Sequence, residues 1–288
     1  MATMWKAAMA SWLLEPLGFE FMQRGLWVAV VVGIVCALVG CYIVLRGMAF
    51  LGDALAHAIL PGLAVGYLAS AGERVSLFWW ALGTAVLTSL GIGALTRGGR
   101  LKQDTAIGIV FAGMFALGIA LISTIRSYAV DLSHFLFGNI LGVTTSDVWM
   151  TTGVSLAVFF VILAFYKEFL VLSFDPLLAT TLRLPARWLE ILLSILTAVA
   201  IVVSLQTVGV ALVAAMLVTP AATASLLTRN LRAMMLLSSL IAAGSGIIGL
   251  YISFYFNVAS GAAIVLTCTA VFAVVWFWWQ FRNSARRA

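Results

Sequence analysis

Long apolar runs, separated by short polar stretches, follow one another along almost the whole chain. Each run is close to the roughly 20 helical residues needed to cross the hydrocarbon core of a bilayer. A segment in lipid must satisfy its own backbone N–H and C=O groups, so these runs are predicted to be helices. The nine runs lie near residues 26–45, 49–70, 76–96, 105–126, 148–166, 189–205, 207–227, 234–254 and 259–280. The pattern predicts an all-α, polytopic transmembrane helical bundle of nine spans, or of eight if a run such as 189–205 or 207–227 is re-entrant.

Composition supports a membrane protein. Only 9% of the 288 residues are charged, and the mean hydropathy is +1.16, whereas a soluble domain carries about a quarter charged residues. Most of the exterior must therefore face lipid. We expect a single transmembrane domain over residues 25–288. It follows an N-terminal segment, residues 1–24, in which Glu15 and Glu20 are mixed with apolar side chains as in interfacial segments.

The distribution of cations predicts the orientation. If the loop at 97–103 faces the cytoplasm and nine spans alternate from there, twelve of the 16 Lys and Arg residues lie inside. The four outside are Lys6, Arg24, Arg74 and Arg126. Such a bias follows the positive-inside rule. It predicts a multi-pass protein of the cell membrane with a cytoplasmic C-terminus, while the side of the N-terminus depends on the number of spans.

Two ionisable residues, Asp53 and His57, lie inside the second run. An ionised side chain near the bilayer centre costs about 2.5–3.5 kcal/mol on insertion scales, so such residues usually face a cavity or a partner. Counted from Arg46, Asp53 lies roughly 10 Å and His57 roughly 16 Å into the core. Residues four apart share one face of a helix. A carboxylate and a neutral imidazole so placed can together bind a divalent cation such as manganese, zinc or iron(II).

Other roles for this pair stay open from spacing alone. Asp53 and His57 could form a buried ion pair that fixes helix packing, or a proton relay. A second pair, Asp131 and His134, falls on the outer side between the fourth and fifth runs. These two residues could supply a ligand at the entrance, but a solvated outer loop with an ordinary histidine is the favoured interpretation.

The longest internal cytoplasmic loop, residues 167–187, contains a predicted short helix. Asp175 is suited to the N-cap and Pro176 to the first helical position. The leucines that follow give this helix an apolar side, which is typical of segments that dock into another protein or lie on lipid. The chain has no GxxxxGK[ST] motif for binding phosphate. If ATP drives the protein, a separate polypeptide must hydrolyse it.

Five segments of the chain resemble the membrane permeases of manganese, zinc and iron ABC importers. The most specific of them is VLRGMAFLGDALAHAILPGLAVG at 44–66, where Ala56 replaces the serine that usually precedes the histidine in this family. The others are EPLGFEFMQRGL at 15–26, HFLFGNILGV at 134–143, SFDPLLATTLRLP at 173–185 and VGVALVAAMLVTPAATA at 208–224. The resemblance extends over nearly the whole chain.

The resemblance implies a permease of the type II ABC importer kind that is not itself an enzyme. Asp53 and His57 match the family's intramembrane metal ligands. Ser173, Phe174, Asp175 and Pro176 match the segment that couples to the ATPase. The expected partners are two cytoplasmic ATPase subunits, an external metal-binding protein, a second permease protomer and membrane lipid, with no nucleic acid. No permanently bound cofactor is expected, only the transported divalent metal.

Two other classes of function are alternatives to the importer. A secondary metal transporter driven by an ion gradient would need no coupling helix. An intramembrane metalloprotease would need a third zinc ligand and a catalytic glutamate in an HExxH-like pattern, which this chain lacks. Among metals, manganese is favoured because the FMQR block at 21–24 looks closer to the manganese branch. Zinc and iron(II) remain alternatives.

Overall fold

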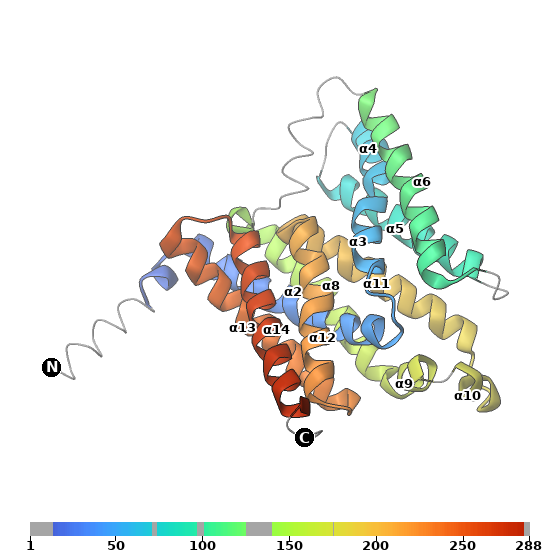
Figure 1. Ribbon diagram of the computed structural model, residues 1–288. Helices are drawn as coiled ribbons and strands as arrows, with labels where there is room; N and C mark the ends of the chain where they lie inside the picture. Colours follow the sequence, from blue (N-terminus) through green and yellow to red (C-terminus); the bar gives the residue numbers. More distant parts are fainter. Residues whose placement is uncertain (1–13, 71–73, 97–100, 125–139, 175, 285–288) are drawn as a thin grey trace.

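The computed structural model describes residues 14–70, 74–96, 101–124, 140–174 and 176–284. All regular elements in these ranges are helices, which confirms the predicted all-α class (Figure 1). In chain order they are η1 Pro16–Gly18, α2 Glu20–Leu45, α3 Leu51–Ala58, α4 Leu60–Ser70, α5 Arg74–Thr96, α6 Gln103–Ser123, η2 Ile140–Gly142, α8 Thr145–Ala164, α9 Tyr166–Phe174, α10 Pro176–Thr181, α11 Ala186–Val208, α12 Val210–Leu227, α13 Leu231–Phe256 and α14 Ser260–Ser284.

Each of the nine predicted runs is helical over most of its described residues. The described part of the chain contains eight spans that are long and apolar enough to cross a membrane, with α3 and α4 counted together as Leu51–Ala69. The remaining apolar helix, α12, provides a shorter stretch, Leu212–Leu227, and carries Pro220 in its interior. This helix corresponds to the run 207–227, one of the two that the sequence analysis gives as possible re-entrant segments. At the other end of the chain, α2 begins at Glu20, so the last part of the segment expected at the interface is the first turn of a long helix.

Helix α2 lies at the centre of the bundle and packs against α8, α11, α12 and α13. In its membrane-crossing stretch, 72% of the residues are buried, against 17% in α6. Helices α2 and α12 approach closely: a Cβ added at Gly40 would come within 1.8 Å of the Leu217 carbonyl oxygen. Only a glycine permits this approach, as is usual where transmembrane helices meet through small residues.

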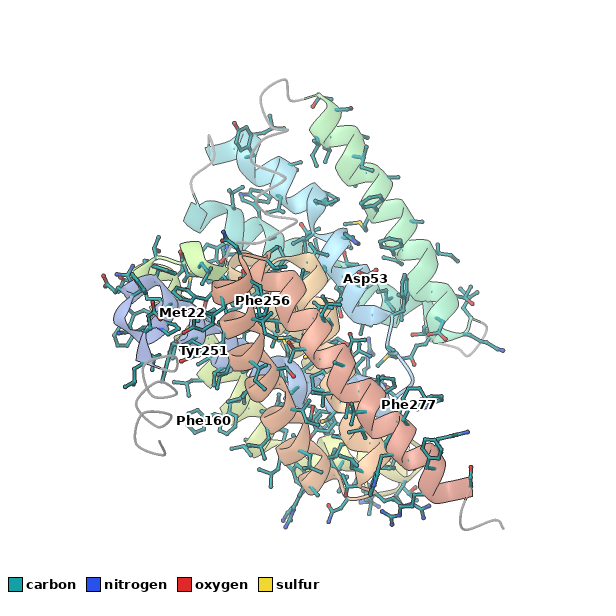
Figure 2. All side chains as sticks on the ribbon, turned by 60° about the vertical axis from the view of Figure 1, so that its left-hand side comes forward. Met22, Asp53, Phe160, Tyr251, Phe256 and Phe277 are labelled. Atoms are coloured by element: carbon teal, nitrogen blue, oxygen red, sulfur yellow. The ribbon has the colours of Figure 1, made fainter. Side chains whose placement is uncertain are left out.

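The peripheral helices present apolar side chains outward. Phe160 on α8, Phe256 on α13 and Phe277 on α14 are 62%, 74% and 55% exposed and lie at the surface of the molecule (Figure 2). A large apolar surface of this kind is expected where a protein contacts lipid or another membrane subunit. The outer surface of the fold therefore agrees with the membrane class predicted from composition.

The second run differs from the single helix that the pattern predicted, because it breaks at Ile59 into α3 and α4. The reason is Pro61, which has no N–H to donate to the carbonyl of His57 four residues earlier. The His57 carbonyl accepts instead from the N–H of Ile59, and the Ile59 carbonyl accepts from the N–H of Leu63 at 3.0 Å. The interruption lies within one turn of His57 and fixes the direction in which α3 leads into α4.

Candidate metal site

Asp53 and His57 lie on one face of α3, as their spacing predicted. The Nε2 atom of His57 is 3.7 Å from Oδ1 of Asp53, and the side chains are 25% and 40% exposed, respectively. Asp53 lies on α3 beside α6 (Figure 2). At a separation of 3.7 Å both atoms can lie about 2.1 Å from one ion placed between them, a normal length for metal–nitrogen and metal–oxygen bonds. The side chains can therefore bind one cation together without a change of helix geometry.

Two phenylalanines of α6 cover the imidazole, and sequence reasoning did not identify them. The ring centroid of His57 lies 5.9 Å from that of Phe111 and 5.6 Å from that of Phe115. The Nδ1 atom of His57 is buried and has no hydrogen-bond partner. The imidazole nitrogen that faces Asp53 is Nε2. In an apolar run, phenylalanines four residues apart look like any lipid-facing pair, so only the packing of α3 on α6 assigns Phe111 and Phe115 to the site.

Glycines hold the surrounding helices close to the break in the second run. A Cβ added at Gly118 of α6 would come within 2.6 Å of Leu60 Cβ and 3.1 Å of Pro61 Cδ. One added at Gly62 of α4 would come within 2.2 Å of Thr84 Oγ1 on α5. The close approach of α6 to the Leu60–Pro61 corner keeps its phenylalanines against His57. These glycines thus position the site without contacting it.

Within the described residues, Asp53 and His57 form an incomplete coordination shell. Among the described residues there is no group of three or more His, Cys, Asp or Glu side chains that could hold a metal. The other candidate ligands, Asp131 and His134, lie outside the described residues. A divalent cation bound by Asp53 and His57 needs further ligands, because manganese, zinc and iron(II) sites usually have at least four.

The segment predicted to couple to an ATPase contains two helices, α9 and α10, which lie before and after residue 175 in sequence. Asp175 itself lies outside the described residues, so its predicted N-cap role stays a prediction. Phe174, Leu178 and Leu182 are 60%, 46% and 56% exposed, which gives this end of the molecule an apolar surface. Ser173 is half-buried. The two helices lie at the same end of the bundle as the end of α14 (Figure 1).

Comparison with known proteins identifies the family. The model of the ABC 3 transport family matches residues 18–279. The chain belongs to this family. The resemblance found in its sequence motifs is thereby confirmed over almost the whole transmembrane domain.

Relatives agree over the same range. The chain is 45% identical over 263 residues to the manganese transport system membrane protein MntC of Halalkalibacterium halodurans, covering 91% of this chain and 89% of that protein. It is 41% identical to a probable iron transport system membrane protein of Haemophilus influenzae, over 92% and 96% of the two chains. Among solved structures, a chain of PsaBC from Streptococcus pneumoniae in complex with Fab matches with a TM-score of 0.80 and 41% identity, over 93% and 95% of the two chains. The chain is therefore a multi-pass permease subunit of an ABC transporter.

Proposed function

We propose that this protein imports manganese(II) into the cytoplasm and that Asp53 and His57 bind the ion in transit. The observation that carries the proposal is the pair itself: a carboxylate and an imidazole one turn apart, 3.7 Å from each other, in a span of otherwise apolar side chains. Ionisable groups at this depth are costly and are retained where they serve an ion pathway. The names of the relatives point to the same class of cargo.

Manganese is the first choice among divalent metals. A carboxylate oxygen with one imidazole suits manganese or iron(II), whereas a structural zinc site would usually add more nitrogen or sulfur ligands. All three cysteines, Cys36, Cys41 and Cys268, are buried in the helix bundle, and none belongs to a group of potential ligands among the described residues. The partial exposure of both side chains leaves room for water to complete the shell of a hard cation.

The importer works as an assembly. Its separate ATPase subunits dock on the apolar surface at Phe174, Leu178 and Leu182, and an external metal-binding protein delivers the ion on the opposite side. This arrangement requires α9, α10 and the C-terminus to be cytoplasmic, as the positive-inside bias predicts. Two permease protomers form a homodimer in which their second spans face each other, so that two Asp53–His57 pairs supply up to four protein ligands. ATP binding opens the path outward, and hydrolysis returns it to the inward state.

The test is ATP-driven uptake of manganese by the permease reconstituted with its ATPase and binding protein in vesicles. Asp53→Ala and His57→Ala should each lower uptake by about tenfold or more, because two strong ligands then become one. The matched control is Glu20→Ala, which removes another i,i+4 ion pair, with Arg24, at an exposed position. Normal uptake by both site variants in correctly assembled complexes would disprove the ligand assignment. Uptake that persists without the ATPase would point to a gradient-driven transporter.

A further inference from the structure

A polar cavity lies beside the start of α3, on the side of the bundle that carries the coupling helices. Its volume is about 390 Å³, it is partly open to the outside, and it is lined by the end of α2, the first turn of α3, the end of α5, the start of α6 and the first half of α11. Its polar lining includes Arg46, Gln103, Glu190, Ser194 and Thr197. A space of this size and polarity holds several water molecules. It is therefore suited to a hydrated ion.

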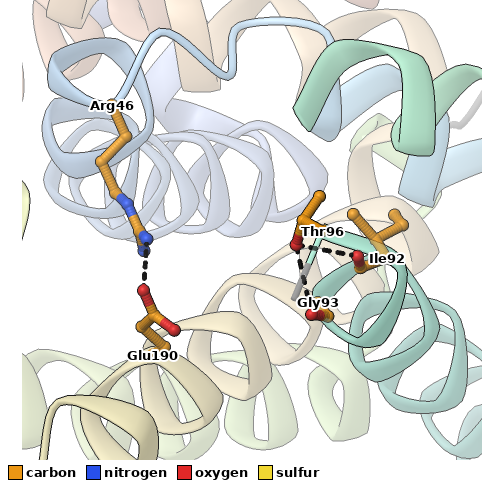
Figure 3. A network of polar contacts seen from close by, with 5 residues as sticks. All are labelled: Arg46, Ile92, Gly93, Thr96 and Glu190. Atoms are coloured by element: carbon orange, nitrogen blue, oxygen red, sulfur yellow. Dashed lines mark hydrogen bonds and ion pairs between the residues drawn. The ribbon is translucent and has the colours of Figure 1, made fainter. Parts of the chain in front are cut away.

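An ion pair bridges one side of this cavity. Nη2 of Arg46 lies 3.2 Å from Oε1 of Glu190, and the two side chains are 13% and 47% exposed. Figure 3 shows the pair joining the end of α2 to α11, opposite Thr96 of α5. The residues are 144 positions apart in sequence. Because Glu190 is half-exposed, the pair is screened by water and is easy to break, unlike an ion pair sealed in the core.

The backbone next to the pair turns sharply at a glycine. Helix α2 ends at Leu45 with Arg46 as its C-cap, and Gly47 follows with φ of +70°, a conformation that favours glycine. The N–H of Met48 donates to the Ile43 carbonyl at 3.0 Å and that of Gly47 to the Val44 carbonyl at 3.1 Å, which closes α2 in a Schellman motif. The chain then turns into α3, so the Arg46–Glu190 bond fixes the direction of the helix that carries Asp53.

Both partners of the ion pair lie on helices that are connected to the coupling helices, α9 and α10. Tyr42 lies one turn before Arg46 on α2, and its ring packs edge-on against Phe169 of α9 with centroids 5.6 Å apart. Glu190 lies in the second turn of α11, which follows α10 after only four residues. A displacement of α9 and α10 by a docked motor would therefore pull on both ends of the Arg46–Glu190 contact.

We propose that the cavity is the exit of the metal path toward the cytoplasm and that the Arg46–Glu190 pair is its gate. This inference rests on the proposed function and on the cytoplasmic placement of α9 and α10. In the closed state Arg46 neutralises Glu190, the one carboxylate among the described residues that line the cavity, and holds α3 against α11. When the coupling helices move, the pair separates, α3 swings about Gly47, and Glu190 becomes available to the departing cation.

The experiment uses the assembled transporter in vesicles and measures two quantities, ATP-independent leakage of manganese and the reactivity of a cysteine placed in the cavity. Glu190→Gln and Arg46→Gln should each raise the leak about fivefold or more, and the charge-swapped double variant Arg46→Glu with Glu190→Arg should return it to within about twofold of the wild type. Arg187→Gln removes an exposed cation from the same first turns of α11 and serves as the control, with no expected leak.

The cysteine readout does not depend on metal transport. Ser194→Cys places a thiol in the cavity lining, and the native cysteines Cys36, Cys41 and Cys268 are all buried, so their background reaction with a membrane-impermeant thiol reagent is low. The reagent should react several-fold faster with Ser194→Cys when Glu190→Gln is also present. Equal rates, or single variants that lose thermal stability without leaking, would overturn the gate. A wild-type complex that takes up no manganese would instead refute the proposed function, and the labelling rates would still decide whether the pair closes the cavity.

Discussion

The Asp53–His57 and Arg46–Glu190 pairs form a contrast. The first is local: its members are four residues apart on one helix, 3.7 Å from each other, with no further partner on the buried Nδ1 atom of His57. The second joins two helices that are 144 residues apart, at 3.2 Å, beside a polar cavity. Neither pair is fully buried, and each contains one half-exposed carboxylate.

Whether the partners lie on one helix or on two determines what each pair can do. An ion pair between two helices that are distant in sequence restrains their relative position, so it is suited to the role of a gate. An i,i+4 pair restrains nothing beyond its own helix, and on an exposed helix it stabilises by only about 0.3–0.5 kcal/mol. Stability therefore gives little reason to keep Asp53 and His57 deep in hydrocarbon. Ligation of a passing cation does give one.

The largest effect is expected from a variant that exchanges the two residues of the local pair, Asp53 and His57. A double variant Asp53→His with His57→Asp keeps an i,i+4 ion pair on α3 but moves the imidazole away from Phe111 and Phe115. A purely structural pair would tolerate the exchange. We expect manganese uptake to fall by about tenfold or more, because the ligands no longer lie at the correct positions. Uptake is measured in vesicles at equal amounts of assembled complex, and near-normal transport would favour the structural role.

The next effect comes from the helix that covers the site. Gly118→Ala places a methyl group 2.6 Å from Leu60 Cβ and should push α6 away from the Leu60–Pro61 corner. Overpacking of this kind costs about 1–3 kcal/mol. We expect a lower denaturation temperature in detergent and reduced uptake.

The matched control for this variant lies on the same helix. Gly113→Ala places its methyl group in open space, with no atom within 4 Å. It should change neither stability nor transport measurably. Equal behaviour of the two alanine variants would show that the close approach of α6 is unimportant.

Removing one aromatic side chain should have an intermediate effect. Phe115→Ala uncovers one side of the His57 ring, whose centroid lies 5.6 Å from that of Phe115 in the native protein. The imidazole then gains rotational freedom and access to water, so we expect the manganese concentration for half-maximal uptake to rise about three- to tenfold. Phe115→Leu, which keeps an apolar cover, should behave closer to the wild type. An unchanged concentration dependence in Phe115→Ala would remove this residue from the site.

The smallest effect is predicted at a contact remote from both pairs. Nε1 of Trp27 on α2 donates to Oγ1 of Thr152 on α8 at 3.0 Å. Thr152→Val removes this bond between exposed side chains, so the loss of stability should not exceed about 1 kcal/mol. Uptake should be unchanged, which can be checked in the same vesicle assay. A large loss of transport would show that the link between α2 and α8 matters more than the comparison of the two ion pairs implies.

The sequence alone determined the class of the protein and predicted Asp53 and His57 as its metal ligands. Long apolar runs can satisfy their backbone in lipid only as helices, so their lengths specified the spans. The spacing of Asp53 and His57 specified a shared face, because it depends only on the local geometry of one helix. The run was predicted as a single helix, although Pro61, which causes the break after His57, is visible in the sequence.

Only the tertiary structure decided the surroundings of those ligands. Phe111 and Phe115 belong to the site because α6 packs on α3, and Arg46 meets Glu190 because α2 ends beside α11. In an apolar chain most helix faces look alike in sequence, so the pattern cannot tell which faces meet. That choice is made by close approaches at particular glycines, such as Gly40 against Leu217 and Gly118 against Leu60, whose fit appears only when the helices are packed together.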